Sequence, residues 1–184
     1  MRWGALFDDL ESQVAAAQRV ALEGHAGELV RAEQSLLALS DRLRGHRGAV
    51  EVVLKGGFRV RGHVTEVAEE WCTLEAPPRS ILIPIRGLVS VSGLSREVLV
   101  EASRVRRTLS LGTALRALAR DRTQVACHID AGGTEPVAVS GMIDVVGRDY
   151  IELTLDRTRD RAAQTVRQTS VIPMANIVAV TSPA

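Results

Sequence analysis

Residues 62–74, GHVTEVAEEWCTL, and residues 141–153, GMIDVVGRDYIEL, follow one pattern without a gap. The glycine and apolar positions coincide in this register: Gly62, Val64, Val67, Trp71 and Leu74 fall opposite Gly141, Ile143, Val146, Tyr150 and Leu153. A second block also recurs: Ile83-Pro84-Ile85 with Leu88, Val89 and Val91 matches Ile172-Pro173-Met174 with Ile177, Val178 and Val180. The sequence therefore predicts two copies of one β-rich unit.

Each copy alternates apolar and polar residues with a period of two, which is typical of half-buried strands. Strands are expected at residues 50–54, 58–64, 71–74, 81–85 and 88–91 in the first copy, and at 125–130, 137–144, 150–155, 169–173 and 177–180 in the second. Gly62 and Gly141 fall midway in the second strand of each copy. A strand that bends sharply needs a residue without a side chain at that point.

The N-terminal region is predicted to be helical, because residues 6–43 lack proline and are rich in good helix formers. Two apolar stripes of different phase meet at Gly24-His25-Ala26-Gly27, so we expect a bent helix or a helical hairpin. The second stripe repeats every seven residues, at Leu22, Leu29, Leu36 and Leu43. This row either joins two copies of the chain in a coiled coil or packs on the sheet that follows.

Residues 95–122 are predicted to form a helical linker. Ser95 is placed to cap a helix whose apolar positions run from Val98 to Leu109, and a second short helix carries Leu115 and Leu118. The second helix occupies the same place before the second copy as residues 36–43 do before the first. Helix plus five strands is thus the expected repeating unit.

A short helix, five bent strands, a glycine midway in the second strand and the segment Ile85-Arg86-Gly87 between the fourth and fifth strands resemble the Sm-like family of SH3-like small barrels. The resemblance implies an α+β protein in which a long helix or helical hairpin (1–45) precedes two five-stranded barrels (46–94 and 123–184) joined by a helical linker (95–122). With residues 2–11, the chain is also similar to a group of uncharacterised actinobacterial proteins, which implies no function.

Sm-like proteins typically bind short RNA segments with an Asp and an Asn near the turn between strands two and three, and with a basic residue before the glycine between strands four and five. Only Arg86 matches this pattern, since both turns lack the Asn and the second copy has Ala175-Asn176 in place of Arg86-Gly87. Arg86 could equally cap a strand end or pair with Glu69 or Glu70.

The linker offers a second basic region, at Arg104, Arg106 and Arg107, which could contact a polyanion or form a solvated helix face. The formal net charge of only +1 gives no strong field to gather nucleic acid, and 3% aromatic residues are few for stacking on bases.

Reaction chemistry is not visible in the sequence. It contains no phosphate-binding glycine loop, no nucleophile with His and Asp partners and no His-rich metal motif. Cys72 and Cys127 have no partner at metal-ligand spacing, which favours plain buried thiols. We therefore expect no enzyme activity, no cofactor and no metal.

No stretch approaches the roughly 20 apolar residues of a membrane span, and the first residues meet acid too early for a secretion signal, so a cytoplasmic location is expected. Exposed strand edges favour a homo-oligomer. The leading hypothesis is a non-catalytic interaction or scaffold protein that self-associates through its helices and barrel edges, or docks to another protein. The alternative is an RNA- or DNA-associated regulator that uses Arg86, Arg104, Arg106 and Arg107.

Overall fold

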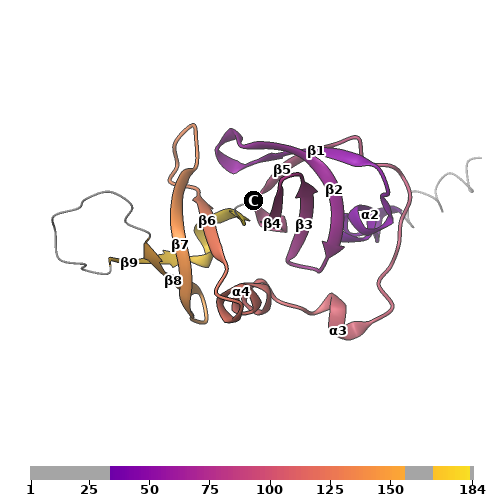
Figure 1. Ribbon diagram of the computed structural model, residues 1–184. Helices are drawn as coiled ribbons and strands as arrows, with labels where there is room; N and C mark the ends of the chain where they lie inside the picture. The colour runs from indigo at the N-terminus through magenta and orange to yellow at the C-terminus, as the bar shows by residue number, and fades with distance from the viewer. Residues whose placement is uncertain (1–33, 156–167, 183–184) are drawn as a thin grey trace, which may run out of the picture. The chain divides into compact units, whose positions relative to one another are not determined.

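The computed structural model of the chain describes residues 34–155 and 168–182 (Figure 1). Residues 1–38 and 39–184 form two separate compact units, and only residues 34–38 of the first are described. Most of the predicted N-terminal helix, including Leu22 and Leu29, therefore lies outside the described residues. The fold below is that of the second unit.

The described residues contradict a continuous helix that reaches Leu43. The chain is helical at residues 34–35 and turns at Leu36, and a separate helix, α2, spans Leu39–Gly45. Contacts with the sheet and the linker hold α2 in place: Leu43 is buried in the core, and Arg42 Nη2 donates a hydrogen bond to the Ser95 carbonyl oxygen at 2.9 Å. These tertiary contacts stabilise a helix of only seven residues, which would be marginal in isolation.

The strands lie where the alternation predicts them. Repeat one (46–94) contains β1 Ala49–Leu54, η1 Lys55–Gly57, β2 Arg59–Val67, β3 Trp71–Ala76, β4 Arg79–Pro84, η2 Ile85–Gly87 and β5 Leu88–Ser92. Repeat two (123–182) contains β6 Gln124–Ile129, β7 Val137–Val146, β8 Tyr150–Leu155, β9 Thr169–Pro173, η3 Met174–Asn176 and β10 Ile177–Thr181. Here η denotes a single turn of 3₁₀ helix.

The two repeats pair their strands in the same register. Val50 lies opposite Gly62 in repeat one, and Val125 lies opposite Gly141 in repeat two. A side chain at Gly62 would collide with the carbonyl oxygen of Glu75, and one at Gly141 with that of Thr154. The same glycine therefore permits the same close approach of β2 to β3 and of β7 to β8, which confirms the duplication at the level of strand pairing.

The prediction of two separate small barrels is wrong. The ten strands of the described residues belong to one antiparallel sheet, in the order β5-β1-β2-β3-β4-β10-β6-β7-β8-β9. Neither repeat closes on itself, because β4 pairs with β10 of the other repeat. An unpaired strand edge leaves backbone N–H and C=O groups without partners, and this pairing satisfies them on both strands.

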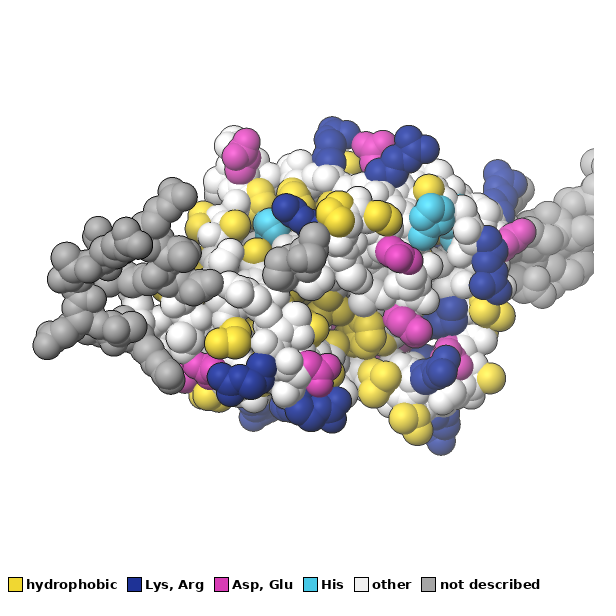
Figure 2. Space-filling model, viewed as in Figure 1, with side chains coloured by type: hydrophobic (Ala, Val, Ile, Leu, Met, Phe, Trp, Pro, Cys, Tyr) yellow, Lys and Arg dark blue, Asp and Glu magenta, His cyan; other side chains and the backbone are white. Residues whose placement is uncertain are grey.

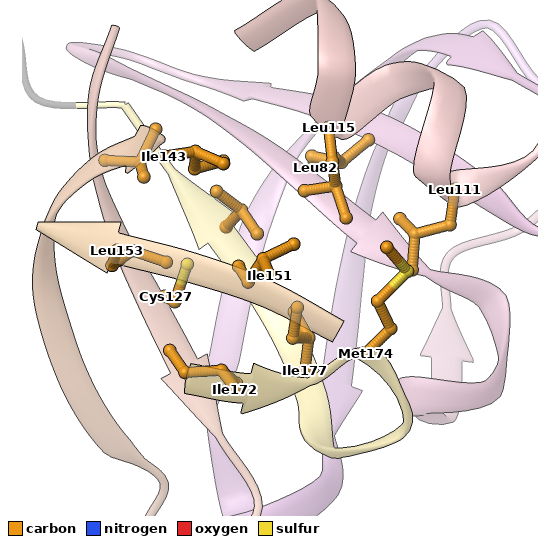
Figure 3. Packing of buried hydrophobic residues seen from close by; sticks show 12 residues of the cluster. Leu82, Leu111, Leu115, Cys127, Ile143, Ile151, Leu153, Ile172, Met174 and Ile177 are labelled. Atoms are coloured by element: carbon orange, nitrogen blue, oxygen red, sulfur yellow. The ribbon is translucent and has the colours of Figure 1, made fainter. Parts of the chain in front are cut away.

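The two hydrophobic cores share residues across this strand pair. The core of repeat two includes Leu82 of β4 along with Leu111 and Leu115, and Figure 3 shows Leu82 within this group. The core of repeat one in turn takes Val178 and Ala179 from β10. Each repeat thus completes the core of the other.

Only part of the predicted linker is helical. The described helices there are α3, Arg104–Arg107, and α4, Leu111–Arg120, whereas residues 97–103 have no regular secondary structure. The segment after Ser95 bonds to α2 instead of to itself: the Leu99 amide donates to the Asp41 carbonyl oxygen at 3.0 Å. The cap of α3 is Ser103 rather than Ser95, and Ser110 caps α4.

Candidate interaction surfaces at the sheet edges

The strand pair β4–β10, called here the inter-repeat joint, shows how one repeat binds another. Val180 lies opposite Leu82 and Thr181 opposite Ile81, and the Ser182 amide donates to the Ser80 carbonyl oxygen at 3.2 Å. The joint brings the fourth strand of one repeat against the fifth strand of the other. It is therefore a heterologous contact between two different edges.

Arg86 is part of this joint. Its Nη2 donates a hydrogen bond to the carbonyl oxygen of Met174, at the start of η3. The next residue, Gly87, faces β10 so closely that a Cβ placed there would lie 3.0 Å from the Val178 carbonyl oxygen. The residue that the Sm-like resemblance associates with RNA thus connects the two repeats, and its contact with RNA stays a prediction.

The same two kinds of edge remain open at the ends of the sheet. β5, the fifth strand of repeat one, is the first strand in the sheet order, and β9, the fourth strand of repeat two, is the last. Each pairs on one side only within the described residues, with β1 and β8 respectively. The sheet thus ends in one edge of each type that the joint uses.

Burial differs sharply between equivalent positions on the paired and the open edges. Val178 of β10 is 1% exposed, whereas its equivalent on β5, Val89, is 64% exposed. Leu82 of β4 is 7% exposed, whereas its equivalent on β9, Val171, is 61% exposed. Val89 and Val171 are therefore apolar side chains at positions that the joint buries.

A hollow of about 380 Å³ runs along the open β5 edge. It is bounded by α2 on one side and by β5 on the other, and its lining includes Leu39, Arg42, Leu88, Val89, Val91 and Leu94. The lining is mixed: aliphatic side chains alternate with Ser90 and Gly93 of the open edge, and Arg42 is already bonded to the Ser95 carbonyl oxygen. This space beside β5 leaves room for an added strand, which would pair with the open backbone edge.

The signal for the joint is present in the sequence of β10. Its residues Ile177 to Val180 form an unbroken apolar run, and every residue of β10 is buried. β5 instead reads Leu-Val-Ser-Val-Ser and is partly exposed. A continuous apolar run is typical of a strand covered on both faces, so β10 could have been distinguished from β5.

The four leucines predicted to mediate oligomerisation differ in burial and in whether the structure describes them. Leu22 and Leu29 lie outside the described residues, Leu36 is exposed, and Leu43 is buried in the core of repeat one. Leu43 therefore packs on the sheet, as the second of the two predicted alternatives has it. Self-association through the leucine row stays a prediction.

The basic residues of the linker lie on α3. Arg104 and Arg106 are exposed, whereas Arg107 is half-buried and its carbonyl oxygen accepts a hydrogen bond from the Glu69 amide at 3.2 Å. Glu70, the next acid, accepts a hydrogen bond from the Leu111 amide at 2.9 Å. Figure 2 shows basic and acidic side chains interspersed over the face in view, without a continuous basic band.

The thiols of Cys72 and Cys127 are buried, one in each repeat, and burial raises the pKa of each to about 12. Within the described ranges, no three His, Cys, Asp or Glu side chains gather closely enough to hold a metal ion. None of the helices in the described part of the chain is long and apolar enough to cross a bilayer.

No family model, curated protein or solved structure matches this chain. The resemblance to Sm-like proteins thus stays a prediction, and the functional argument depends on the geometry of the sheet edges and on the residues that line them.

Proposed function

We propose that the protein is a non-catalytic interaction protein of the cytoplasm that self-associates through the open edges of its sheet. The observation that carries the proposal is the pair of exposed valines, Val89 and Val171, at positions whose equivalents are buried in the inter-repeat joint. β9 of one copy would pair antiparallel with β5 of a second copy, as β4 pairs with β10 inside the chain.

The joint also supplies the register. In the chain Val180 lies opposite Leu82 and Thr181 opposite Ile81. The equivalent contacts between copies place Val91 opposite Val171 and Ser92 opposite Ser170. This arrangement buries the valines and gives partners to the backbone groups of both open edges.

The energetic balance favours a reversible contact. Burying each valine stabilises the contact by about 1.5–3 kcal/mol, and each new backbone hydrogen bond adds about 0.5–1.5 kcal/mol. Association costs roughly 4–15 kcal/mol in lost rotational and translational freedom. These gains and this cost are similar in size, so we expect weak association that depends on protein concentration.

The contact joins two different edges, so a pair of copies keeps one open edge of each type for further copies. Repetition of such a contact gives a closed ring if the rotation between neighbouring copies adds up to a full turn. Otherwise it gives an open chain of copies. Other proteins with an exposed strand could enter the same edges by strand addition.

The test compares two edge variants with the unmodified chain by light scattering over a concentration series. Val89→Lys places a charge on β5, and Val171→Lys places one on β9; each alone should remain monomeric. Val105→Lys, at an exposed valine on α3, is the matched control and should associate like the unmodified chain.

Mixing the two edge variants gives the sharpest readout. The Val89→Lys chain keeps its β9 edge and the Val171→Lys chain keeps its β5 edge, so the mixture should form dimers and stop there. An unmodified chain that stays monomeric at about 1 mM would refute self-association. Association that survives both lysines would refute the edges as its site.

A second candidate function is nucleic-acid binding by α3. Arg104 and Arg106 are exposed, and none of the ion pairs in the described part of the chain involves them. Contacts of this kind release counterions, so binding would weaken steeply as salt increases. The Arg104→Gln, Arg106→Gln double variant should lose binding to pooled RNA at low salt, and Arg59→Gln on β2 is the control.

A further inference from the structure

A hollow separate from the open edges lies across the inter-repeat joint. Its volume is about 550 Å³, within the range of sites that hold small organic molecules. The turn before β4 forms one wall, and β6, β7 and the end of β10 form the rest. The lining residues that matter here are Pro78, Arg79, Ala126, His128, Ala138 and Ser140.

Arg79 and His128 bring nitrogen groups from the two repeats to this hollow. Arg79 is exposed, and none of the hydrogen bonds or ion pairs found in the described ranges occupies its guanidinium. His128 is half-buried, and its ring stacks on Phe58 of repeat one with centroids 4.7 Å apart. Its Nε2 lies 3.4 Å from Thr181 Oγ1. The stack fixes the plane of the imidazole.

Arg79 is the charged side chain among the lining residues, so the hollow favours negative charge. Burial lowers the pKa of His128, and the positive charge of Arg79 lowers it further. The acids on neighbouring segments are Glu75 on β3, Asp130 after β6 and Glu135 before β7. Asp130 Oδ1 accepts a hydrogen bond from the Gly132 amide, and none of the three forms an ion pair with Arg79 or His128.

We propose that this hollow binds a small organic anion, with its acidic group between Arg79 and His128 and its apolar part on Pro78, Ala126 and Ala138. The planar guanidinium presents paired donors that match a carboxylate or a phosphate. The volume is far larger than a bare ion needs, and the small side chains of Ala126, Ala138 and Ser140 leave the sheet surface open. The site does not depend on self-association.

Binding of an anion there has a specific spectroscopic consequence. A negative charge beside His128 stabilises the imidazolium, so the pKa of His128 should rise when the site is filled. Because Arg79 belongs to repeat one and His128 to repeat two, the ligand also joins the repeats. The full-length chain should therefore unfold at a higher temperature when the ligand is present.

The experiment follows the ring protons of the histidines by NMR in the full chain, with phenyl phosphate, benzoate and inorganic phosphate as separate probes. We expect the His128 resonance to shift saturably with phenyl phosphate or benzoate, and its pKa to rise, while exposed His63 shows neither effect. The two organic probes distinguish a phosphate ligand from a carboxylate.

The variants make the assignment specific. Arg79→Gln should weaken binding by about tenfold or more, Arg79→Lys by less, and Arg104→Gln on α3 should leave it unchanged. Arg79 is exposed, so its substitution should leave the fold intact. An amide NMR spectrum of the variant that matches that of the unmodified chain checks this. The proposal is overturned by the absence of a saturable His128 shift at about 10 mM of every probe, by equal binding in Arg79→Gln, or by inorganic phosphate binding as tightly as the organic probes.

Discussion

Leu82 and Val171 occupy equivalent positions in two copies of one strand, yet Leu82 is 7% exposed and Val171 is 61% exposed. The difference arises because β4 has β10 beside it, whereas β9 has a neighbour on one side only among the described residues. Each repeat therefore presents the same pair of edges, and the chain uses one of each internally. The two that remain are the surfaces through which we expect copies to meet.

Ala175→Arg should strengthen self-association. Ala175 is equivalent to Arg86, whose guanidinium donates to the Met174 carbonyl oxygen across the inter-repeat joint. In the proposed contact between copies, an arginine at 175 would reach the carbonyl oxygen of Ile85 in the second copy. A hydrogen bond from a charged group contributes about 1.5–3 kcal/mol, so the dissociation constant should fall at least about tenfold in sedimentation equilibrium.

The control for Ala175→Arg adds the same charge elsewhere. Ala102→Arg, at an exposed linker position, should leave the dissociation constant unchanged. If Ala175→Arg associates no more tightly than Ala102→Arg, the proposed register between copies is wrong.

The strands and the duplicated glycines could be predicted because both depend on local pattern. Apolar and polar residues that alternate with a period of two indicate which face of a strand is buried. A glycine in mid-strand indicates a close approach of a neighbouring backbone. The strand pair β4–β10 could not be predicted in this way, since alternation does not specify which strand lies at each edge. The apolar run of β10 indicated burial on both faces but named no partner.

The helical predictions were less accurate. Apolar spacing typical of a helix does not indicate whether other segments bind the backbone N–H and C=O groups that a helix would use. Residues around Leu99 have helical spacing, yet the Leu99 amide bonds to Asp41 on α2. A role for Arg86 in RNA binding is implied only by the resemblance to Sm-like proteins. No local pattern indicates that its hydrogen-bond acceptor is the carbonyl oxygen of Met174, which lies 88 positions away in the sequence.

Gly62→Ala and Gly141→Ala should each destabilise the fold. A Cβ at Gly62 would collide with the Glu75 carbonyl oxygen, and one at Gly141 with that of Thr154, so neighbouring backbone must move. Overpacking of this kind costs about 1–3 kcal/mol, which urea unfolding would measure. Gly133→Ala is the control, since the nearest atom to its Cβ would be the Glu135 carbonyl oxygen, 3.8 Å away, and it should change stability little. Equal stability of all three variants would contradict the close approach.

Cys72 and Cys127 should resist thiol reagents in the folded protein. Burial raises the pKa of both thiols to about 12, so the reactive thiolate is scarce at neutral pH, and neither sulfur is accessible. Labelling by a disulfide reagent should proceed only as fast as the protein opens, and should become rapid in denaturant. Fast stoichiometric labelling under native conditions would contradict the packing of both cores.

The stability of the fold should depend on His128 below neutral pH. Burial and then the charge of Arg79 lower its pKa in the folded state, so the unfolded chain binds the proton more readily. The neutral imidazole is therefore fully stabilising above the unfolded pKa of about 6.5, and stability is lost as the pH falls from there through the lowered pKa. Urea midpoints between about pH 7.5 and pH 5 would measure this loss.

His128→Phe separates this effect from other acid-sensitive groups. Phenylalanine keeps a ring against Phe58 but carries no titratable nitrogen, so the variant should lose the part of the pH dependence that His128 supplies. Arg79→Gln should reduce that dependence without abolishing it, because burial is the larger cause of the lowered pKa. His63→Phe, at an exposed histidine on β2, should keep the dependence of the unmodified chain, and a slope that survives His128→Phe unchanged would assign it to another group.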